Sequence, residues 1–338
     1  MLRYYVVNHA SLPERKDQVI DEIQKSKPDK IICCSLEEYD YKCLFGSFVE
    51  SIAPYLNSIN QKLLFFGPFV PVVNPFPKHA DFVETMGYYH WGVGMVDNFR
   101  KNNEAFKFAD DSVLFTNYNN NAKYQRAMLV DQFVKYDLLK DGIVTLNRPD
   151  RMFMPDGTPY VFKYHTGEPL FDEVDFVLNA SIPYGAGSIP RSYMRGFVDI
   201  VSESTYGLGE FFITEKTGKA IGTLKPFLIY GPPYIHRHLK EKYGIELYDE
   251  LFDYSFDAEI DIQHRMEGII SNLLRLRNLT QTQLKELHTL IENKLRSNRD
   301  AFIQLREDKS FVPKELIEMK RSGIEFFGDT LTPILSYL

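Results

Sequence analysis

FVDIVSESTYGLGEFFITEKTGKAIGTLKPFLIYG, residues 197–231, decides the fold, because two apolar runs in this segment flank one helix-length stretch. The runs FVDIVS and PFLIYG are rich in Val, Ile, Leu and Phe, as expected of buried strands. Between them, Thr214 is a natural N-cap for a short helix that begins at Glu215. Strand, helix and strand in this order predict an α/β unit.

The first part of the chain repeats this rhythm of strand and helix. Three apolar runs are separated by stretches of helix length, and Pro54 is expected to end or kink the second helix. Runs joined in this way predict a βαβαβ unit whose sheet is parallel and buried. The expected strands are residues 2–8, 30–35 and 62–66, and the expected helices are residues 11–26 and 42–53.

The rhythm restarts in the second part of the chain and ends in long helices. We expect strands at residues 112–117 and 142–146, a helix at 122–139, and an insertion with a hairpin at 147–166. The pattern predicts an α/β protein with two Rossmann-like domains facing a cleft and C-terminal helices packing across them. The expected divisions are residues 1–108, 109–260 and 261–338.

Composition limits the partners that the chain is expected to have. Lys and Arg total 39 against 46 Asp and Glu, a formal charge of -7, which disfavours DNA as an obligatory partner. No stretch approaches the roughly 18 to 20 apolar residues of a membrane span. The three cysteines lack the spacing of a zinc site, so we expect buried thiols, no metal, and a cytoplasmic protein.

Polar residues after the expected strands are the candidates for a ligand site, since ligands of parallel sheets lie beyond the carboxyl ends of the strands. Asn117 and Asn119 follow one such strand, and Glu203 follows another. The chain lacks a G-x-G-x-x-G after its first strand, a P-loop and a G-x-S-x-G. A simple dinucleotide oxidoreductase is therefore disfavoured.

Glu215 and Lys216 form an acid and base pair in the first turn of the expected helix. The free N–H groups and positive dipole end of a helix N-terminus suit an anion such as a diphosphate. The lysine would neutralise phosphate charge, and the glutamate would accept hydrogen bonds from paired hydroxyls of a ribose or sugar. The alternative is an exposed ion pair that contributes ~0 to 1 kcal/mol to stability.

Residues 197–231 resemble the donor-binding segment of the α1,3-fucosyltransferase family. In that family, a strand ends in a short acidic motif, and an aromatic-x-Thr-Glu-Lys sequence then opens a helix. Here Glu203 lies in the acidic motif, and Phe212-Ile213-Thr214-Glu215-Lys216 matches the second motif. By this resemblance Phe212 stacks on the base. The family usually has aromatic-Glu-Asn-Ser where this chain has Ser202-Glu203-Ser204, so the resemblance leaves the sugar and the nucleotide open.

A second stretch, residues 115–133, is similar to the family's strand, Asn-containing loop and helix. An arginine near the start of that helix contacts the donor diphosphate in the family, and Arg126 occupies its position here. Both stretches also look like those of uncharacterised glycosyltransferase-like proteins from viruses and phages. Together they cover roughly a fifth of the chain.

The resemblance implies a glycosyltransferase that transfers a sugar from a nucleoside diphosphate sugar to a glycan or other hydroxyl acceptor. The implied arrangement is GT-B-like, with the acceptor in the first domain and the donor in the second, without a resident cofactor or metal. A viral chain of this kind would act in the host cytoplasm. Two alternatives remain, a phage-type transferase that glycosylates hydroxymethylated DNA bases and a non-catalytic module that binds nucleotide sugars or glycans.

An inverting transfer also needs a general base from the opposite domain. The candidates follow the first two expected strands and are His9, Glu37, Glu38 and Asp40. A structural or merely exposed histidine, and a solvated helix start at the glutamates, are the alternatives. A transfer that retains configuration needs no such base.

Overall fold

The computed structural model describes residues 3–8, 12–34, 44–67, 70–71, 76–84, 96–119, 123–147, 152–154, 157–170, 176–178, 189–206, 210–307 and 325–328. The chain divides into two compact units. The first comprises Met1–His90, Leu208–Phe212 and Leu305–Leu338, and the second comprises Trp91–Gly207 and Ile213–Gln304. The division thus falls near residue 90 where the sequence suggested residue 108, and most of the C-terminal helical segment belongs to the second unit.

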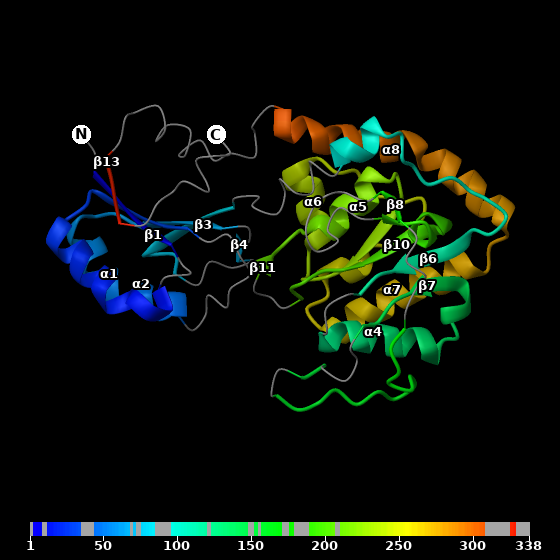
Figure 1. The fold of residues 1–338 in the computed structure, drawn as a ribbon, viewed down its shortest axis with the longest axis horizontal. Helices are drawn as coiled ribbons and strands as arrows, with labels where there is room; N and C mark the ends of the chain where they lie inside the picture. Colours follow the sequence, from blue (N-terminus) through cyan, green and yellow to red (C-terminus); the bar gives the residue numbers. More distant parts are fainter. Residues whose placement is uncertain are drawn as a thin grey trace. The chain divides into compact units, whose positions relative to one another are not determined.

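The first unit contains the parallel sheet expected from its three apolar runs. Its described strands lie in the order β13-β1-β2-β3-β5, and each neighbouring pair is parallel. Two helices connect successive strands and pack against each other (Figure 1). The elements are β1 (Arg3–Asn8), α1 (Leu12–Ser26), β2 (Lys30–Cys34), α2 (Leu44–Ser58), β3 (Leu63–Gly67), β5 (Ala80–Glu84) and β13 (Glu325–Gly328), with a short antiparallel pair of β4 (Val70–Pro71) and β11 (Glu210–Phe211).

Helix α2 continues through Pro54, so this proline does not end the helix, which was one of its two expected effects. Proline lacks the N–H that would bond one turn earlier, and its ring usually kinks or breaks a helix. Here Ile52 and Leu56 on either side of it are 2% and 0% exposed in the hydrophobic core of the unit. Burial of this face outweighs the lost backbone hydrogen bond.

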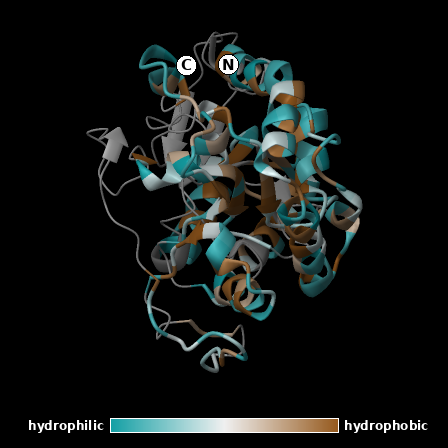
Figure 2. Ribbon diagram, turned by 90° about the vertical axis from the view of Figure 1, so that its right-hand side faces the viewer, coloured by the Kyte–Doolittle hydropathy of each residue, from teal (hydrophilic) through white to brown (hydrophobic). Residues whose placement is uncertain are grey.

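The second unit also contains a parallel sheet, in the order β12-β10-β6-β7. Figure 1 shows helices on both faces of this sheet, and most residues of its strands are hydrophobic (Figure 2). Mixed α/β architecture with parallel sheets is therefore confirmed in both units. The strands are β6 (Val113–Asn117), β7 (Gly142–Val144), β10 (Gly196–Ser202) and β12 (Phe227–Tyr230), and the helices are α4 (Tyr124–Lys135), α5 (Glu215–Gly222), α6 (Ile235–Tyr243), α7 (Ile262–Arg277) and α8 (Gln281–Glu307).

Smaller elements complete the described part of the second unit. The expected hairpin of the insertion is present as a bridge between Phe153 and Pro159, with Gly157 at a positive φ of 83° in its turn. None of the helices in the described ranges is long and apolar enough to cross a membrane. The remaining elements are β8 (Phe176–Leu178), β9 (Ile189–Pro190), and the 3-10 helices η2 (Leu139–Asp141), η5 (Ser192–Arg195) and η6 (Ser255–Ala258).

The strand order of the second unit contains a topological switch point. Strand β6 comes first in the chain, β7 lies on one side of it, and β10 lies on the other side. The connections that leave β6 and β10 at their carboxyl ends therefore diverge, one toward β7 and the other toward β12. In open parallel sheets this divergence opens the crevice where ligands bind.

A buried polar cluster also ties these strands together. The Lys225 amino group donates to Thr116 Oγ1 at 2.7 Å and to the Tyr193 carbonyl at 2.8 Å. Thr116 and Tyr193 in turn donate to the two carboxylate oxygens of Asp199, at 3.1 and 2.6 Å. Burial lowers the pKa of Lys225 to about 7, although Asp199 acts in the opposite direction.

We predict that Lys225→Met lowers the free energy of unfolding by about 3 kcal/mol or more, because it removes two buried hydrogen bonds and the positive charge that acts on Asp199. Urea-induced unfolding of the full chain measures this loss. Lys240→Met, which removes an exposed lysine of the same unit, should change stability by under about 0.5 kcal/mol. The double variant Lys225→Met/Asp199→Asn should lose less than the sum of the two single losses, and strict additivity would contradict the coupling.

Candidate functional site

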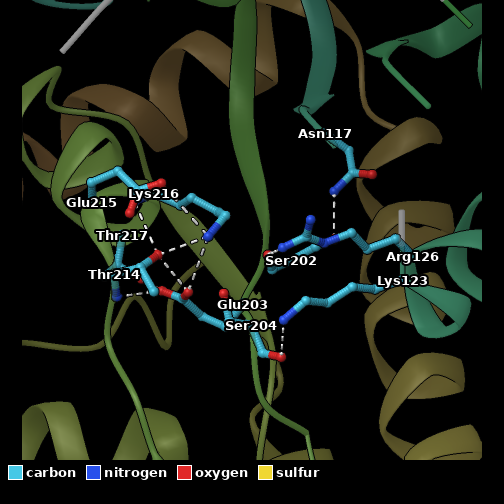
Figure 3. A network of polar contacts seen from close by, with 10 residues as sticks. All are labelled: Asn117, Lys123, Arg126, Ser202, Glu203, Ser204, Thr214, Glu215, Lys216 and Thr217. Atoms are coloured by element: carbon cyan, nitrogen blue, oxygen red, sulfur yellow. Dashed lines mark hydrogen bonds and ion pairs between the residues drawn. The ribbon is translucent and has the colours of Figure 1, made fainter. Parts of the chain in front are cut away.

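Three cationic side chains meet the chain at three consecutive residues where β10 ends. An Arg126 guanidinium nitrogen donates to the Ser202 carbonyl at 3.3 Å, and the Lys123 amino group donates to the Ser204 carbonyl at 3.0 Å. Between these residues, the Glu203 carboxylate lies 3.7 Å from the Lys216 amino group. Figure 3 shows Lys216 on one side of this strand end and the other two cations on the opposite side. We call Lys123, Arg126 and Lys216 the cation cluster.

Helix α4 supplies two members of the cation cluster because of their spacing at its start. Lys123 is the N-cap residue and Arg126 lies three positions later, so both side chains project from the same face of the first turn. Lys123 is half-buried, whereas Arg126 is 2% exposed and lies deepest. Helix α4 follows β6, the neighbour of β10, so it begins at the switch point. Its cations therefore lie close to the end of β10.

Helix α5 supplies Lys216, and Glu203 holds the start of this helix. Thr214 is its N-cap as predicted, with its side-chain oxygen accepting the Lys216 N–H at 3.3 Å. The Glu203 carboxylate accepts the Thr214 N–H at 3.0 Å, the Thr214 hydroxyl at 2.6 Å and the Thr217 hydroxyl at 2.8 Å. Glu203 is 0% exposed, so its oxygens bind the protein and are not available to a ribose. Glu203 and Thr214 therefore position the helix.

Glu215 and Lys216, the acid and base pair at the start of α5, form an ion pair in the structure. The Lys216 amino group lies 3.7 Å from the Glu215 carboxylate and donates to Thr214 Oγ1 at 3.0 Å. Burial raises the pKa of the Glu215 carboxyl, but neighbouring cations outweigh it and hold this pKa below its ordinary value. These cations are Lys216, Lys219 and Arg126. Arg126 and Lys216 thus act on the same carboxylate from different helices.

Asn117 and Asn119 lie at this site but are occupied by contacts within the sheet. The Asn117 side-chain NH₂ donates to the Ile200 carbonyl at 2.6 Å and to Ser202 Oγ at 3.1 Å. The Asn119 NH₂ donates to Asn117 Oδ1 at 2.6 Å and to the Thr145 carbonyl at 3.1 Å. Both side chains are at most 1% exposed. They bind β6 to its neighbours, and their expected role as donor ligands stays a prediction.

Arg265 of helix α7 fixes the loops that border the cation cluster. Its guanidinium donates to the Gly231 carbonyl at 3.0 Å and to the Tyr206 carbonyl at 2.5 Å. Two further bonds go to the carbonyls of Glu259 and Ile260, at 2.6 and 2.7 Å. Arg265 therefore joins the segment after β10 to the segment after β12. The sequence analysis missed this residue, because one arginine in an amphipathic helix carries no signal of its tertiary contacts.

Phe212, expected to stack on a base, does not lie with the other predicted residues. Its ring is 1% exposed and belongs to the hydrophobic core cluster of the first unit. The chain enters that unit at residues 208–212 and returns to the second unit at Ile213. Phe212 is therefore a core residue. The general-base candidates His9, Glu37, Glu38 and Asp40 lie outside the described residues and stay predictions.

Lys123 is the cation that the sequence analysis did not identify. A usable signal was present, because Lys123 precedes Arg126 by one helical turn at the start of a helix that follows a buried strand. The chemistry of the site is that of an anion site, with three cations gathered around a strand end whose own carboxylate is engaged. Across the described ranges, no group of three or more His, Cys, Asp or Glu side chains is arranged to hold a metal ion.

No protein-family model, curated protein or solved structure matches this chain with statistical significance.

We predict that Glu203→Gln destabilises the start of α5 by about 1 to 3 kcal/mol, because an amide cannot replace the charge-assisted bonds to Thr214 and Thr217. Amide hydrogen exchange should become faster in residues 214–218 and remain unchanged in α7. Glu286→Gln, on the exposed surface of α8, is the matched control and should alter neither exchange nor stability. Unchanged exchange in α5 of the Glu203 variant would show that the carboxylate does not hold this helix.

Proposed function

We propose that this chain is a glycosyltransferase that uses a nucleoside diphosphate sugar, with the donor diphosphate bound at the cation cluster of the second unit. The acceptor would be a glycan or another molecule with a free hydroxyl group. The observation that carries the proposal is the convergence of Lys123, Arg126 and Lys216 on residues 202–204 at the switch point of a parallel sheet.

The charge of the site favours a diphosphate over a neutral ligand. Glu203 and Glu215 oppose the cation cluster, but the Glu203 carboxylate is already saturated by hydrogen bonds from the start of α5. Lys219 adds a fourth positive charge close to Glu215. The N–H groups of the first turns of α4 and α5 add positive potential at the same end of the sheet.

The three cations lie at different depths in the site and would therefore act differently on the diphosphate during the transfer. The bond between the anomeric carbon and the diphosphate oxygen breaks, and negative charge builds on the departing diphosphate. Lys216 and Lys123, both partly exposed, would contact the phosphate oxygens, and the buried Arg126 would stabilise the charge from below. The acceptor hydroxyl forms the new bond to the anomeric carbon and gives up its proton to a base.

Two further features support this function over other uses of an anion site. Residues 115–133 and 197–231, which resemble donor-binding segments of the α1,3-fucosyltransferase family, are the segments that carry the cation cluster and α5. Each unit has its own parallel α/β sheet, which supports a GT-B-type arrangement of an acceptor domain and a donor domain. His9, Glu37, Glu38 or Asp40 of the first unit would supply the base.

The second candidate is a module that binds nucleotide sugars without transferring them. It is favoured by the fact that all three cations come from the second unit, so binding needs no residue of the first unit. The two functions differ in whether bound donor is turned over. Glycosylation of DNA bases has no comparable support among the described contacts.

We predict slow release of nucleotide from one member of a panel of UDP, GDP, CDP and dTDP sugars, measured by coupled detection of the free nucleotide. Lys216→Ala should lower kcat/KM by about 100-fold or more, as expected when one stabilising cation of a developing anion is lost. Lys285→Ala, an exposed lysine of α8, is the matched control and should leave turnover unchanged.

The outcomes of this panel separate the two candidates. Saturable binding of a nucleotide sugar without release, weakened by Lys216→Ala, would identify a binding module. If no member of the panel binds or shifts thermal unfolding, both candidates are wrong.

A further inference from the structure

Three tyrosine rings form a row beside the cation cluster. The ring centroids of Tyr124 and Tyr206 are 6.4 Å apart, with an interplanar angle of 65°, and those of Tyr206 and Tyr230 are 6.1 Å apart. Tyr230 is fully buried at the end of β12, whereas Tyr124 and Tyr206 are half-buried. Tyr206 is the middle ring of the row, and Tyr124 and Tyr206 are the two tyrosines of the row that remain partly exposed.

The chain places these two rings next to the phosphate-binding side chains. Tyr124 directly follows Lys123 in the first turn of α4. Tyr206 lies two residues after Ser204, whose carbonyl accepts the Lys123 amino group at 3.0 Å. The Tyr206 carbonyl is held by Arg265, which fixes the backbone of this residue. Rings and cations thus have defined positions relative to one another at the same strand end.

Neither ring of the Tyr124 and Tyr206 pair stacks flat on the other. At 65° the rings meet edge to face, so they do not cover each other as a stacked pair would. A nucleoside diphosphate carries a planar base attached through its ribose to the charged diphosphate. A half-exposed aromatic pair adjoining a cation cluster matches these two parts of one ligand, because bases stack on tyrosine rings whatever their hydrogen-bonding pattern.

We propose that Tyr124 and Tyr206 bind the base of a nucleoside diphosphate by stacking, which is the role that the family resemblance implied for Phe212. This inference rests on the proposed function, since it presumes that the diphosphate binds at the cation cluster. It adds the nucleoside as the second recognised part of the ligand and assigns its binding to unit two alone.

Equilibrium binding of two kinds of ligand to the full chain, nucleoside diphosphates and pyrophosphate, tests the proposal. Isothermal titration compares each nucleoside diphosphate (UDP, GDP, CDP and dTDP) with inorganic pyrophosphate, which has the charges without the base. Tyr124→Leu and Tyr206→Leu keep apolar bulk but remove the ring, and they should bind the preferred nucleoside diphosphate about tenfold more weakly. Their affinity for pyrophosphate should be unchanged. Tyr124→Phe and Tyr206→Phe keep the ring and should bind both ligands as the native chain does.

Tyr164→Leu is the matched control, because Tyr164 is 46% exposed in the insertion of the same unit and should affect neither ligand. Thermal unfolding shows which variants are folded, and if the Tyr206 variants are not, the Tyr124 pair decides. Stacking is overturned if both leucine variants bind the nucleoside diphosphate as tightly as the native chain, or if the native chain binds it no better than pyrophosphate. If neither ligand binds the native chain, the proposed function fails first, and the role of the rings fails with it.

Discussion

The hydrogen bonds from the start of α5 to the buried Glu203 carboxylate are the constraint on which the site depends. They join Glu203, directly after β10, to a helix whose N-cap lies eleven residues later, after the chain has passed through the first unit. Without this carboxylate, the Thr214 N–H group and the hydroxyls of Thr214 and Thr217 would be buried without their acceptor. With it, Lys216 is held where Arg126 and Lys123 approach from α4. Glu203, which the sequence suggested as a ligand-binding residue, therefore helps to position the cations that would bind the ligand.

Strand order explains why helices distant in sequence meet at this point. The connections after β6 and after β10 leave the sheet at neighbouring strands, so α4 and α5 both begin at the switch point. Their first turns bring N–H groups and cationic side chains to one end of the sheet, where an anion would be stabilised. The tyrosines lie at the same end because they occupy the same connections. Fold and chemistry therefore follow from one topological feature of the second unit.

Much of the fold was predictable, because alternation of apolar runs and helical stretches reports directly on buried parallel strands. Thr214 as an N-cap was predictable for a similar reason, since capping depends on local geometry. Residue types alone could not show whether Asn117 or Glu203 faces a ligand or the protein, because that depends on neighbours such as Ser202 and Thr217 that are distant or on another element. Phe212 shows the limit most clearly. Phe212 lies two residues before Thr214 in the same motif, yet its ring packs in the core of the first unit.

The central claim is that the cation cluster binds a diphosphate, and lysine footprinting tests it most directly. The full chain is acetylated briefly with and without saturating nucleoside diphosphate, and the modification rate of each lysine is measured by mass spectrometry. The account predicts that the ligand protects Lys123 and Lys216 while the rate at the exposed Lys285 is unchanged. Equal rates at Lys123 and Lys216 with and without a ligand that demonstrably binds would contradict it.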